Sequence, residues 1–330
     1  MAVEERFLRV PTLGECLEEW LDRCRPRGLK VSTARGYRTM ATLYIPDELR
    51  QVPIGEVTGA RLDNLYDELL RTGRRDGRGL APVTVRKVHL ILHGTLARAL
   101  KRGHIPKNPA LEAEPPSGRA CKPPVFPVWS PAELQRFLRS AQSHPYYAAF
   151  HLAASTGLRR GELLGLRWCD VNLDNARLQV LQTVIVVNAD VLVDTPKSPT
   201  SRRRVDLDNR TVEVLRQQLV RSATAHGLDA PELECSPDLI FTRGLSAPVH
   251  PTLFSYWFQR QVQLAGVRRI RLHDLRHTHA TLALQAGVHP KVVSERLGHS
   301  SITITLDTYS HVLPSMQRDA AEQVAALIEV

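Results

Sequence analysis

The residues of this chain whose types and spacing could support joint chemistry are two arginines, two histidines and one tyrosine. His273 and Arg276 lie three positions apart, so on a helix they would share one face and could both contact one anionic group. His299 and Tyr309 follow this pair, and Arg159 lies far upstream. An H-x-x-R pair also occurs by chance on surface helices, so it becomes informative only together with its neighbours.

Charge and composition narrow the class of partner. The 330 residues carry a formal net charge of +10, which favours a polyanionic partner and a binding affinity that weakens with salt. A basic protein without such a partner would carry the same charge. The five cysteines form no C-x-x-C pair, which argues against zinc and against a disulfide framework. No apolar run of about 18 residues is present, so no membrane span is expected.

Three stretches of the sequence resemble the tyrosine recombinase family, also called phage integrases. They are TGLRRGELLGL (156–166), HDLRHTHATLALQAG (273–287) and LGHSSITITLDTYSH (297–311), and they occur in the family's order. The resemblance implies a site-specific DNA recombinase that integrates or excises a mobile element through a 3′-phosphotyrosyl intermediate and a Holliday junction. It also implies double-stranded DNA and a homotetramer on paired sites as partners, and no metal or other cofactor.

The resemblance implies a role for each of the five residues. Arg159 and Arg276 would clamp the scissile phosphate, because guanidinium groups combine a planar fork of donors with a permanent charge. Tyr309 would attack the phosphorus, and a phenol with a pKa of about 10 needs neighbouring groups to help remove its proton. His273 and His299 would hydrogen-bond the non-bridging oxygens or assist proton transfer.

Further side chains near these motifs have less distinct roles. In the family a lysine on a turn between two strands protonates the leaving 5′ oxygen, and Lys197 lies between two predicted strands as that pattern requires. Glu162 matches an acidic position that would orient a catalytic arginine, although an ordinary structural salt bridge fits equally well. His277 and His279 are interpreted as structural, and His311 has no role that we can assign.

Basic side chains around the motifs and in the first half are candidates for contacts with the DNA backbone. Each of them taken singly is more often an ordinary surface charge. These candidates are Lys30, Arg35, Arg38, Arg86, Lys87, Arg160, Arg202, Arg203 and Arg204.

Apolar spacing and turn residues predict a mainly α protein with a small antiparallel β-sheet. Residues 1–112 are predicted to form four helices, and the resemblance implies that they are the SAM-like core-type DNA-binding domain. The helices are expected from Leu13, around 32–43, around 58–72 and after Pro82, with a capping box at Thr12 and Glu15.

The second half is expected to be an α+β catalytic domain. Five prolines in residues 113–128 predict an extended linker before it. The domain would span residues 129–330 and open with a capping box at Ser130 and Glu133. Strands are expected over 178–187, 191–194 and 203–207, in one small sheet.

Two other functions fit parts of the pattern. A type IB topoisomerase would use the same nucleophile to relax supercoils without exchanging partners, although the domain layout argues against it. A catalytically inactive accessory protein would keep the fold and DNA binding, but all the catalytic residue types are present here.

Several properties stay open at the level of sequence. Many phage integrases carry an arm-binding domain before the helical domain. In this chain the helical domain begins close to Met1. Either this protein uses simple core sites or the arm-binding domain is missing, which leaves the need for accessory directionality or bending proteins undecided. A helix over 314–330 would dock on its own domain or on a neighbouring protomer. The start lacks the layout of a signal peptide, so a cytoplasmic, nucleoid-associated protein is expected.

Overall fold

The computed structural model describes residues 10–24, 31–118, 120–121, 126–187, 190–194, 202–309, 321–322, 324–326 and 328. The chain divides into two compact units, Met1–Pro124 and Val125–Val330, and the division falls inside the proline-rich segment. Within the described residues, no helix has both the length and the apolar character that a membrane crossing needs.

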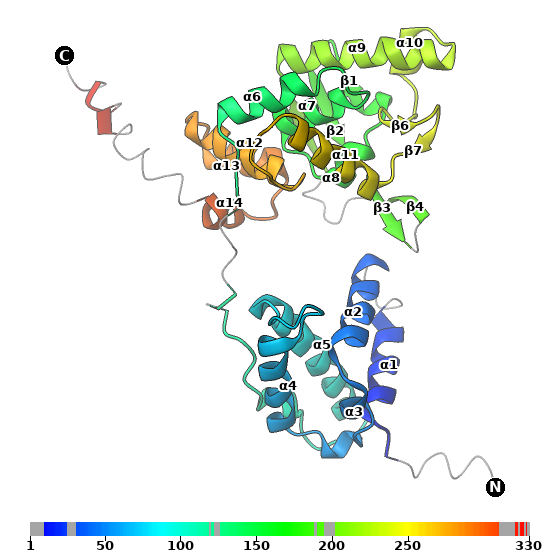
Figure 1. The fold of residues 1–330 in the computed structure, drawn as a ribbon, viewed down its shortest axis with the longest axis vertical. Coiled ribbons are helices and arrows are strands. Elements are labelled where there is room, and N and C mark those ends of the chain that lie inside the picture. Colours follow the sequence, from blue (N-terminus) through cyan, green and yellow to red (C-terminus); the bar gives the residue numbers. More distant parts are fainter. Residues whose placement is uncertain are drawn as a thin grey trace. The chain divides into compact units, whose positions relative to one another are not determined.

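The first unit is a small helical domain around one long helix (Figure 1). Val85, Val88 and Leu92 lie on one face of that helix and are fully buried. The capping box predicted at the start of the unit is confirmed, because the Thr12 amide donates to Glu15 Oε2 over 2.8 Å and the Glu15 amide donates to Thr12 Oγ1 over 3.2 Å. The helices are α1 (Leu13–Cys24), α2 (Val31–Tyr44), α3 (Asp47–Arg50), α4 (Gly59–Thr72) and α5 (Pro82–Lys101), with 3-10 turns at Ile54–Glu56 and Pro109–Leu111.

The second unit is also mainly helical. Its helices are α6 (Pro131–Ser140), α7 (Tyr147–Thr156), α8 (Arg160–Leu164), α9 (Asn209–His226), α10 (Ala230–Glu234), α11 (Pro251–Leu264), α12 (Asp274–Gln285), α13 (Pro290–Leu297) and α14 (Ile302–Tyr309), with a 3-10 turn at Trp168–Asp170. The capping box predicted at Ser130 and Glu133 is present at the start of α6. The expected fold class, mainly α with small antiparallel sheets, is confirmed.

The strands pair differently from the expectation of one sheet. They are β1 (Val171–Asn172), β2 (Arg177–Val180), β3 (Thr183–Val187), β4 (Asp190–Asp194), β5 (Arg203–Asp206), β6 (Thr242–Arg243) and β7 (Ala247–Pro248). The expected 178–187 strand is split into β2 and β3, and between them Gln182 donates from Nε2 to the Gly165 carbonyl over 2.8 Å, next to the end of α8. Strand β5 pairs with β2 in a β1-β2-β5 sheet, while β3 and β4 form a separate hairpin.

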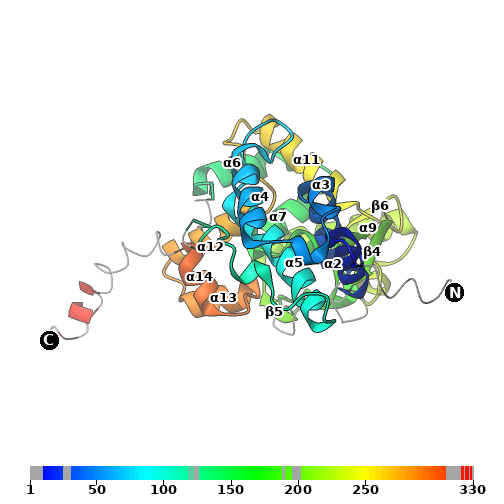
Figure 2. The same ribbon diagram turned by 90° about the horizontal axis from the view of Figure 1, so that it is seen from below.

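The core of the second unit fixes the helices that carry the three motifs. Trp129, Phe137, Phe150, Phe254 and Phe258 are all at most 1% exposed and pack as one aromatic cluster. Helix α12 packs on α7 and on α13, and α13 packs on α14. Figures 1 and 2 both show α12, α13 and α14 side by side at one end of this unit. The packing therefore brings residues far apart in sequence to one place.

Candidate active site

Arg159 lies at a tight turn between α7 and α8. Helix α7 ends at Gly157, whose φ of +66° is in the left-handed region that favours glycine. A Cβ atom there would lie 2.6 Å from Leu297 Cδ2 and 3.0 Å from His279 Cδ2, so a larger residue would collide with α12 and α13. The turn therefore needs glycine, and it places Arg159 directly before α8.

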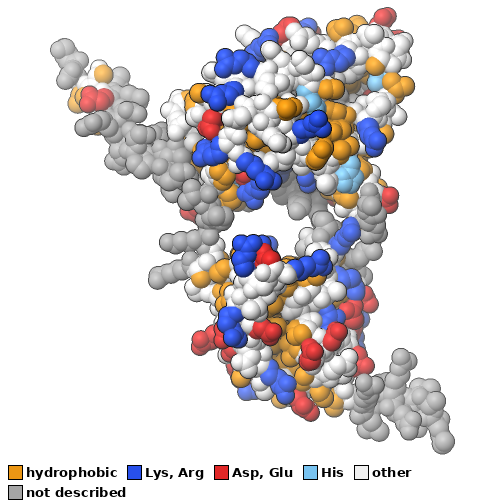
Figure 3. All heavy atoms as spheres, in the orientation of Figure 1, with side chains coloured by type: hydrophobic (Ala, Val, Ile, Leu, Met, Phe, Trp, Pro, Cys, Tyr) orange, Lys and Arg blue, Asp and Glu red, His pale blue; other side chains and the backbone are white. Residues whose placement is uncertain are grey.

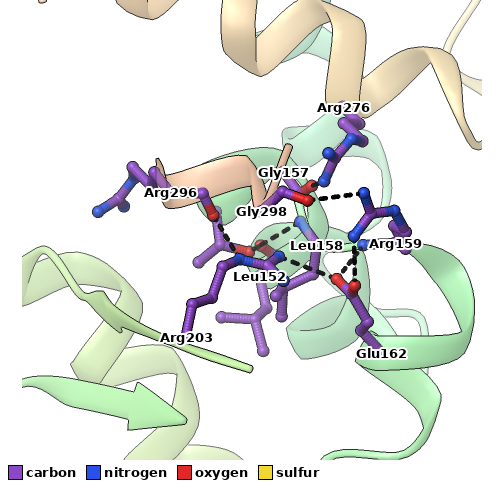
Figure 4. Close-up of polar contacts among 10 residues, drawn as sticks. Leu152, Gly157, Leu158, Arg159, Glu162, Arg203, Arg276, Arg296 and Gly298 are labelled. Atoms are coloured by element: carbon purple, nitrogen blue, oxygen red, sulfur yellow. Dashed lines mark hydrogen bonds and ion pairs between the residues drawn. The ribbon is translucent and has the colours of Figure 1, made fainter. Parts of the chain in front are cut away.

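A buried carboxylate holds two arginines at this turn (Figure 4). Glu162 Oε1 accepts from Arg159 Nη1 over 2.7 Å, and Glu162 Oε2 accepts from Arg203 Nη2 over 2.9 Å. The side chains of Glu162 and Arg203 are only 4% and 6% exposed. Burial alone would raise the pKa of Glu162, but the hydrogen bond from Arg203 and the charge of Arg159 lower it below its usual value. The carboxylate is therefore ionised at neutral pH.

Arg276 lies deeper than the other arginines. It is 4% exposed, and its Nη1 donates to the Gly157 carbonyl over 2.9 Å. Its Nη2 is buried and has no hydrogen-bond partner in the described part of the chain. Desolvation and the charge of Arg159 lower the pKa of Arg276 to about 9, so the group is still a cation at neutral pH. The site thus contains a buried cation with an unused donor.

Residues 297–299 (Leu-Gly-His), at the end of α13, lie beside Arg159. Helix α13 ends at Gly298, which has a φ of +68°, and the Gly298 carbonyl accepts from Arg159 Nη2 over 3.0 Å. The next residue, His299, has its Nδ1 2.8 Å from Thr305 Oγ1. Desolvation and the charges of Arg276 and Arg159 lower the pKa of His299 to about 4. His299 is therefore a neutral imidazole at pH 7.

Tyr309 is the last residue of α14 and is 2% exposed. Its hydroxyl oxygen lies 2.8 Å from His277 Nδ1. Desolvation raises the pKa of Tyr309 to about 12, although the charge of Arg276 acts to lower it. The ring of His273 meets the His277 ring edge to face, with centroids 5.2 Å apart. His273 itself remains exposed, and desolvation by its neighbours and the charge of Arg276 lower its pKa.

The structure thus brings together most of the catalytic residues expected from sequence. Arg159 donates to the Gly298 carbonyl and Arg276 to the Gly157 carbonyl, and the charge of Arg276 acts on His273, His299 and Tyr309. Lys197, Lys30 and His311 lie outside the described residues.

His277 is the residue that sequence reasoning missed. The sequence pattern indicates a structural role for it, yet it contacts the hydroxyl of the expected nucleophile. It follows His273 by four positions, so on a helix the two imidazoles lie on one face. That spacing is the signal that could have found it.

The DNA-contact candidates lie in different environments. Arg203 differs from the expectation, because its guanidinium is buried against Glu162 and its Nε donates to the Arg296 carbonyl over 2.6 Å. Arg160 is exposed and donates to Ser255 Oγ over 2.8 Å. Arg38 is ion-paired with Glu18 and Asp22, and Arg86 donates to the Pro116 carbonyl. The remaining candidates described, which are Arg35, Lys87, Arg202 and Arg204, are exposed.

Lys and Arg side chains are spread over the visible face of each unit rather than gathered into one patch (Figure 3). On the first unit Asp and Glu side chains are interspersed with them. Side-chain charge on these faces therefore does not by itself define a DNA-binding surface.

Comparison with known proteins assigns the chain to a family. The family model described as the phage integrase family matches residues 129–316, and the chain therefore belongs to this family and is a tyrosine recombinase. A tyrosine recombinase XerC-like protein of Caldanaerobacter subterraneus subsp. tengcongensis is 26% identical over 94% of this chain and 82% of its own length. The ICEBs1 integrase of Bacillus subtilis is 25% identical over 86% of this chain and 75% of its own length.

Solved structures share the fold. The Tn1549 transposon integrase in complex with a circular intermediate DNA has a TM-score of 0.76 at 21% identity, covering 95% of this chain and 99% of that one. A lambda integrase tetramer bound to a Holliday junction has a TM-score of 0.68 at 18% identity. The match covers 93% of this chain and 80% of the lambda integrase chain.

Replacing Glu162 by glutamine should strongly destabilise the second unit. The Glu162→Gln side chain keeps its shape but removes the charged half of the buried ion pair with Arg203, and breaking such a pair costs about 3 kcal/mol. Chemical denaturation monitored by circular dichroism measures the loss. The control is Asp174→Asn, which breaks an exposed pair with Arg216 and should cost under about 1 kcal/mol. Equal effects of the two substitutions would contradict the structural role of Glu162.

Half-buried neutral histidines should make the second unit less stable in mild acid. Desolvation lowers the pKa values of His277, His279 and His299 to about 4, below the roughly 6.5 of an unfolded histidine. The unfolded chain therefore binds more protons, so the free energy of unfolding falls as pH drops from about 6.5 towards 4. In His279→Gln the fall in Tm between pH 7.5 and 5.5 should be smaller than in the wild type. The exposed His104→Gln serves as control, and an unchanged fall in His279→Gln would refute the expectation.

Proposed function

We propose that this recombinase cuts and rejoins DNA with Tyr309 as nucleophile and with the scissile phosphate bound between Arg159 and Arg276. The observation that carries the proposal is the Nη2 of the buried Arg276, which has no hydrogen-bond partner among the residues that the structure describes. Arg159 and Arg203 act on this cation by repulsion and Glu162 by attraction. An anion that docks beside Arg159 would supply a partner for Nη2 and would relieve the repulsion.

A phosphodiester fits this anion site better than a carboxylate would. Two guanidinium groups can donate to several oxygens of one phosphate, and their charge suits the additional negative charge of a pentacoordinate transition state. Arg159 is fixed by Glu162 and by the Gly298 carbonyl, while Arg276 is fixed by the Gly157 carbonyl. Because the donors are held before the substrate arrives, little reorganisation accompanies the reaction.

In the proposed reaction the Tyr309 oxygen forms a bond to phosphorus as the bond to the 5′ oxygen breaks. The product is a 3′-phosphotyrosyl bond and a free 5′-hydroxyl, and the reverse attack by a 5′-hydroxyl rejoins the strand. The covalent bond conserves the energy of the phosphodiester. His273 and His299 would hydrogen-bond the non-bridging oxygens, and Lys197 would protonate the leaving 5′ oxygen.

The proposed assembly is a homotetramer on two double-stranded sites, which exchanges strands through a Holliday junction to integrate or excise a mobile element. The structures of lambda integrase as a tetramer on a Holliday junction, and of Tn1549 integrase with circular intermediate DNA, support this proposal. Exposed basic side chains such as Arg35, Lys87 and Arg204 would contact the DNA backbone. Nucleoid association and accessory directionality or bending proteins belong to the same proposal.

The nucleophile can be tested before the target site has been mapped. The protein is incubated with sheared, lightly nicked DNA of the genome that encodes it, because a nick near the cleavage point lets the 5′-hydroxyl fragment diffuse away and traps the adduct. We expect SDS-stable adducts whose sequenced ends map the site, and none with Tyr309→Phe. Tyr256→Phe, at a tyrosine that is 58% exposed, should leave adduct formation unchanged. Adducts with Tyr309→Phe would refute the nucleophile, and their absence from the wild type would favour the inactive accessory protein.

Strand exchange separates a recombinase from a topoisomerase. A supercoiled plasmid and a labelled linear duplex, each with a mapped site, are incubated with the protein. Because we expect cleaved ends to change partners, the label should become covalently joined to plasmid DNA, and Tyr309→Phe should abolish the transfer. Relaxation of the plasmid without transfer of the label would contradict recombination and support the topoisomerase alternative.

A further inference from the structure

We propose that His277 accepts the proton of the Tyr309 hydroxyl during strand cleavage, and that Phe126 of the proline-rich segment positions its imidazole. This inference rests on the proposed role of Tyr309 as nucleophile. It assigns a catalytic role to a histidine other than His273 and His299, the two histidines expected to be catalytic from the sequence.

The contact between the two side chains is direct. Tyr309 Oη and His277 Nδ1 are 2.8 Å apart, which is a short hydrogen bond. The tyrosine is 2% exposed and packs with Ala280, Leu284 and Leu297, so bulk water does not surround the phenol. The proton of such a hydroxyl needs an acceptor within the protein, and His277 is placed to be that acceptor.

His277 is in the protonation state that an acceptor needs. Desolvation and the charges of His273, Arg276 and Arg271 lower its pKa to about 4, although Asp274 acts to raise it. The imidazole is therefore neutral at pH 7 and can present a lone pair on Nδ1 with its hydrogen on Nε2.

The same electrostatics prevent proton transfer before DNA binds. The Tyr309 pKa of about 12 against about 4 for His277 keeps the proton on the phenol in the free protein. A phosphate bound at Arg276 would offset the positive charge that disfavours the imidazolium. As the new O–P bond forms, the phenol oxygen loses basicity, so the proton moves when the substrate is attacked.

Phe126 fixes the plane of this imidazole. The rings of Phe126 and His277 are stacked, with centroids 4.1 Å apart and planes 5° apart. Arg271 lies over the Phe126 ring, with its Cζ 5.7 Å from the centroid, and is paired with Asp274 over 2.9 Å. With His273 against its edge, the His277 ring is restrained so that Nδ1 faces Tyr309. Phe126 is thus a positioning residue that joins the proline-rich segment to the nucleophile.

The proton balance is closed in both directions. On cleavage the Tyr309 O–H bond breaks, the proton goes to His277 Nδ1, the O–P bond forms, and the 5′ O–P bond breaks with its electron pair on the 5′ oxygen. On rejoining, the 5′-hydroxyl gives its proton back to the group that supplied it, its oxygen forms the bond to phosphorus as the bond to Tyr309 breaks, and the His277 imidazolium returns its proton to the phenolate. The proton for the leaving 5′ oxygen comes from a separate acid, so the two transfers can be tested separately.

The experiment measures single-turnover adduct formation on a nicked duplex with the mapped site. His277→Asn can keep a hydrogen bond near the Nδ1 position but accepts no proton, so we expect it to be about 100-fold slower or more. The matched control is His89→Asn in the first unit, where His89 Nδ1 lies 3.0 Å from the buried Tyr66 hydroxyl in the same kind of pair. The control should stay within about twofold of the wild type. A wild-type or faster rate for His277→Asn would overturn the proposal.

A substrate with sulfur in place of the leaving 5′ oxygen identifies which proton is involved. A thiolate leaves without protonation, so it rescues loss of a general acid but not loss of the group that deprotonates the nucleophile. The His277→Asn defect should therefore persist on this substrate. Rescue would mean that His277 protonates the leaving group and would refute its role at Tyr309.

The positioning role of Phe126 has its own test. Phe126→Ala should lower the rate of adduct formation, and Phe126→Tyr, which keeps the stacking ring, should restore it. A wild-type rate for Phe126→Ala would refute the positioning role.

Nitrogen-15 NMR of histidine-labelled protein tests the pair without DNA. We expect His277 as the Nε2–H tautomer at pH 7, with an Nδ1 resonance that shifts in Tyr309→Phe. An Nδ1–H tautomer would make His277 a donor to Tyr309 and would overturn the inference. If the wild type forms no adduct, the proposed function itself fails; if it forms one and His277→Asn is unimpaired, only the role of His277 fails.

Discussion

The buried carboxylate of Glu162 joins three segments that are far apart in the chain. It fixes Arg159 at the start of α8 and Arg203 at the start of β5, and Arg203 in turn holds the Arg296 carbonyl near the end of α13. The position of Gly298 follows from these contacts, since its carbonyl receives the second donor of Arg159. A shift in any one of these segments would leave a charge or a donor buried without a partner, which explains why the small sheet matters to a site built mainly on helices.

The single negative charge of Glu162 does not balance the positive charges of Arg159, Arg203 and Arg276. Arg159 and Arg203 both repel Arg276, whose buried guanidinium keeps an unused donor. Such an arrangement is unfavourable in the free protein and would become favourable on binding of an anion, so under the proposed mechanism binding energy would be directed to the place where charge develops in phosphoryl transfer. Desolvation lowers the pKa values of His273 and His299, and the positive charge already present lowers them further, because an imidazolium would add to it.

Local signals in the sequence were sufficient for the longer helices of the first unit and for the order of the motifs, whereas the four-residue helix α3 was not among the four helices predicted there. The capping boxes at Thr12 and Ser130 are local patterns, and the helical spacing behind them marks buried faces. Pairing between distant segments was not predictable in this way. Strand β5 pairs with β2 rather than with its neighbour in sequence, and Arg203 at the start of β5 is buried against Glu162. His277 was missed for the same reason, since its contact with a residue 32 positions away depends on how α12, α13 and α14 pack.

The positive charge of the site also decides which imidazole can do which task. An imidazole that must take a proton has to be neutral beforehand, and desolvation together with the charge of the arginines proposed to bind phosphate keeps His277 and His299 neutral at pH 7. His299 has its Nδ1 engaged with Thr305, and His273 is exposed at the start of α12, whereas His277 has Nδ1 on the buried phenol. Phosphate binding would then reduce the repulsion at the imidazole that faces the nucleophile. Under the proposed mechanism, substrate binding and activation of Tyr309 would be coupled through charge.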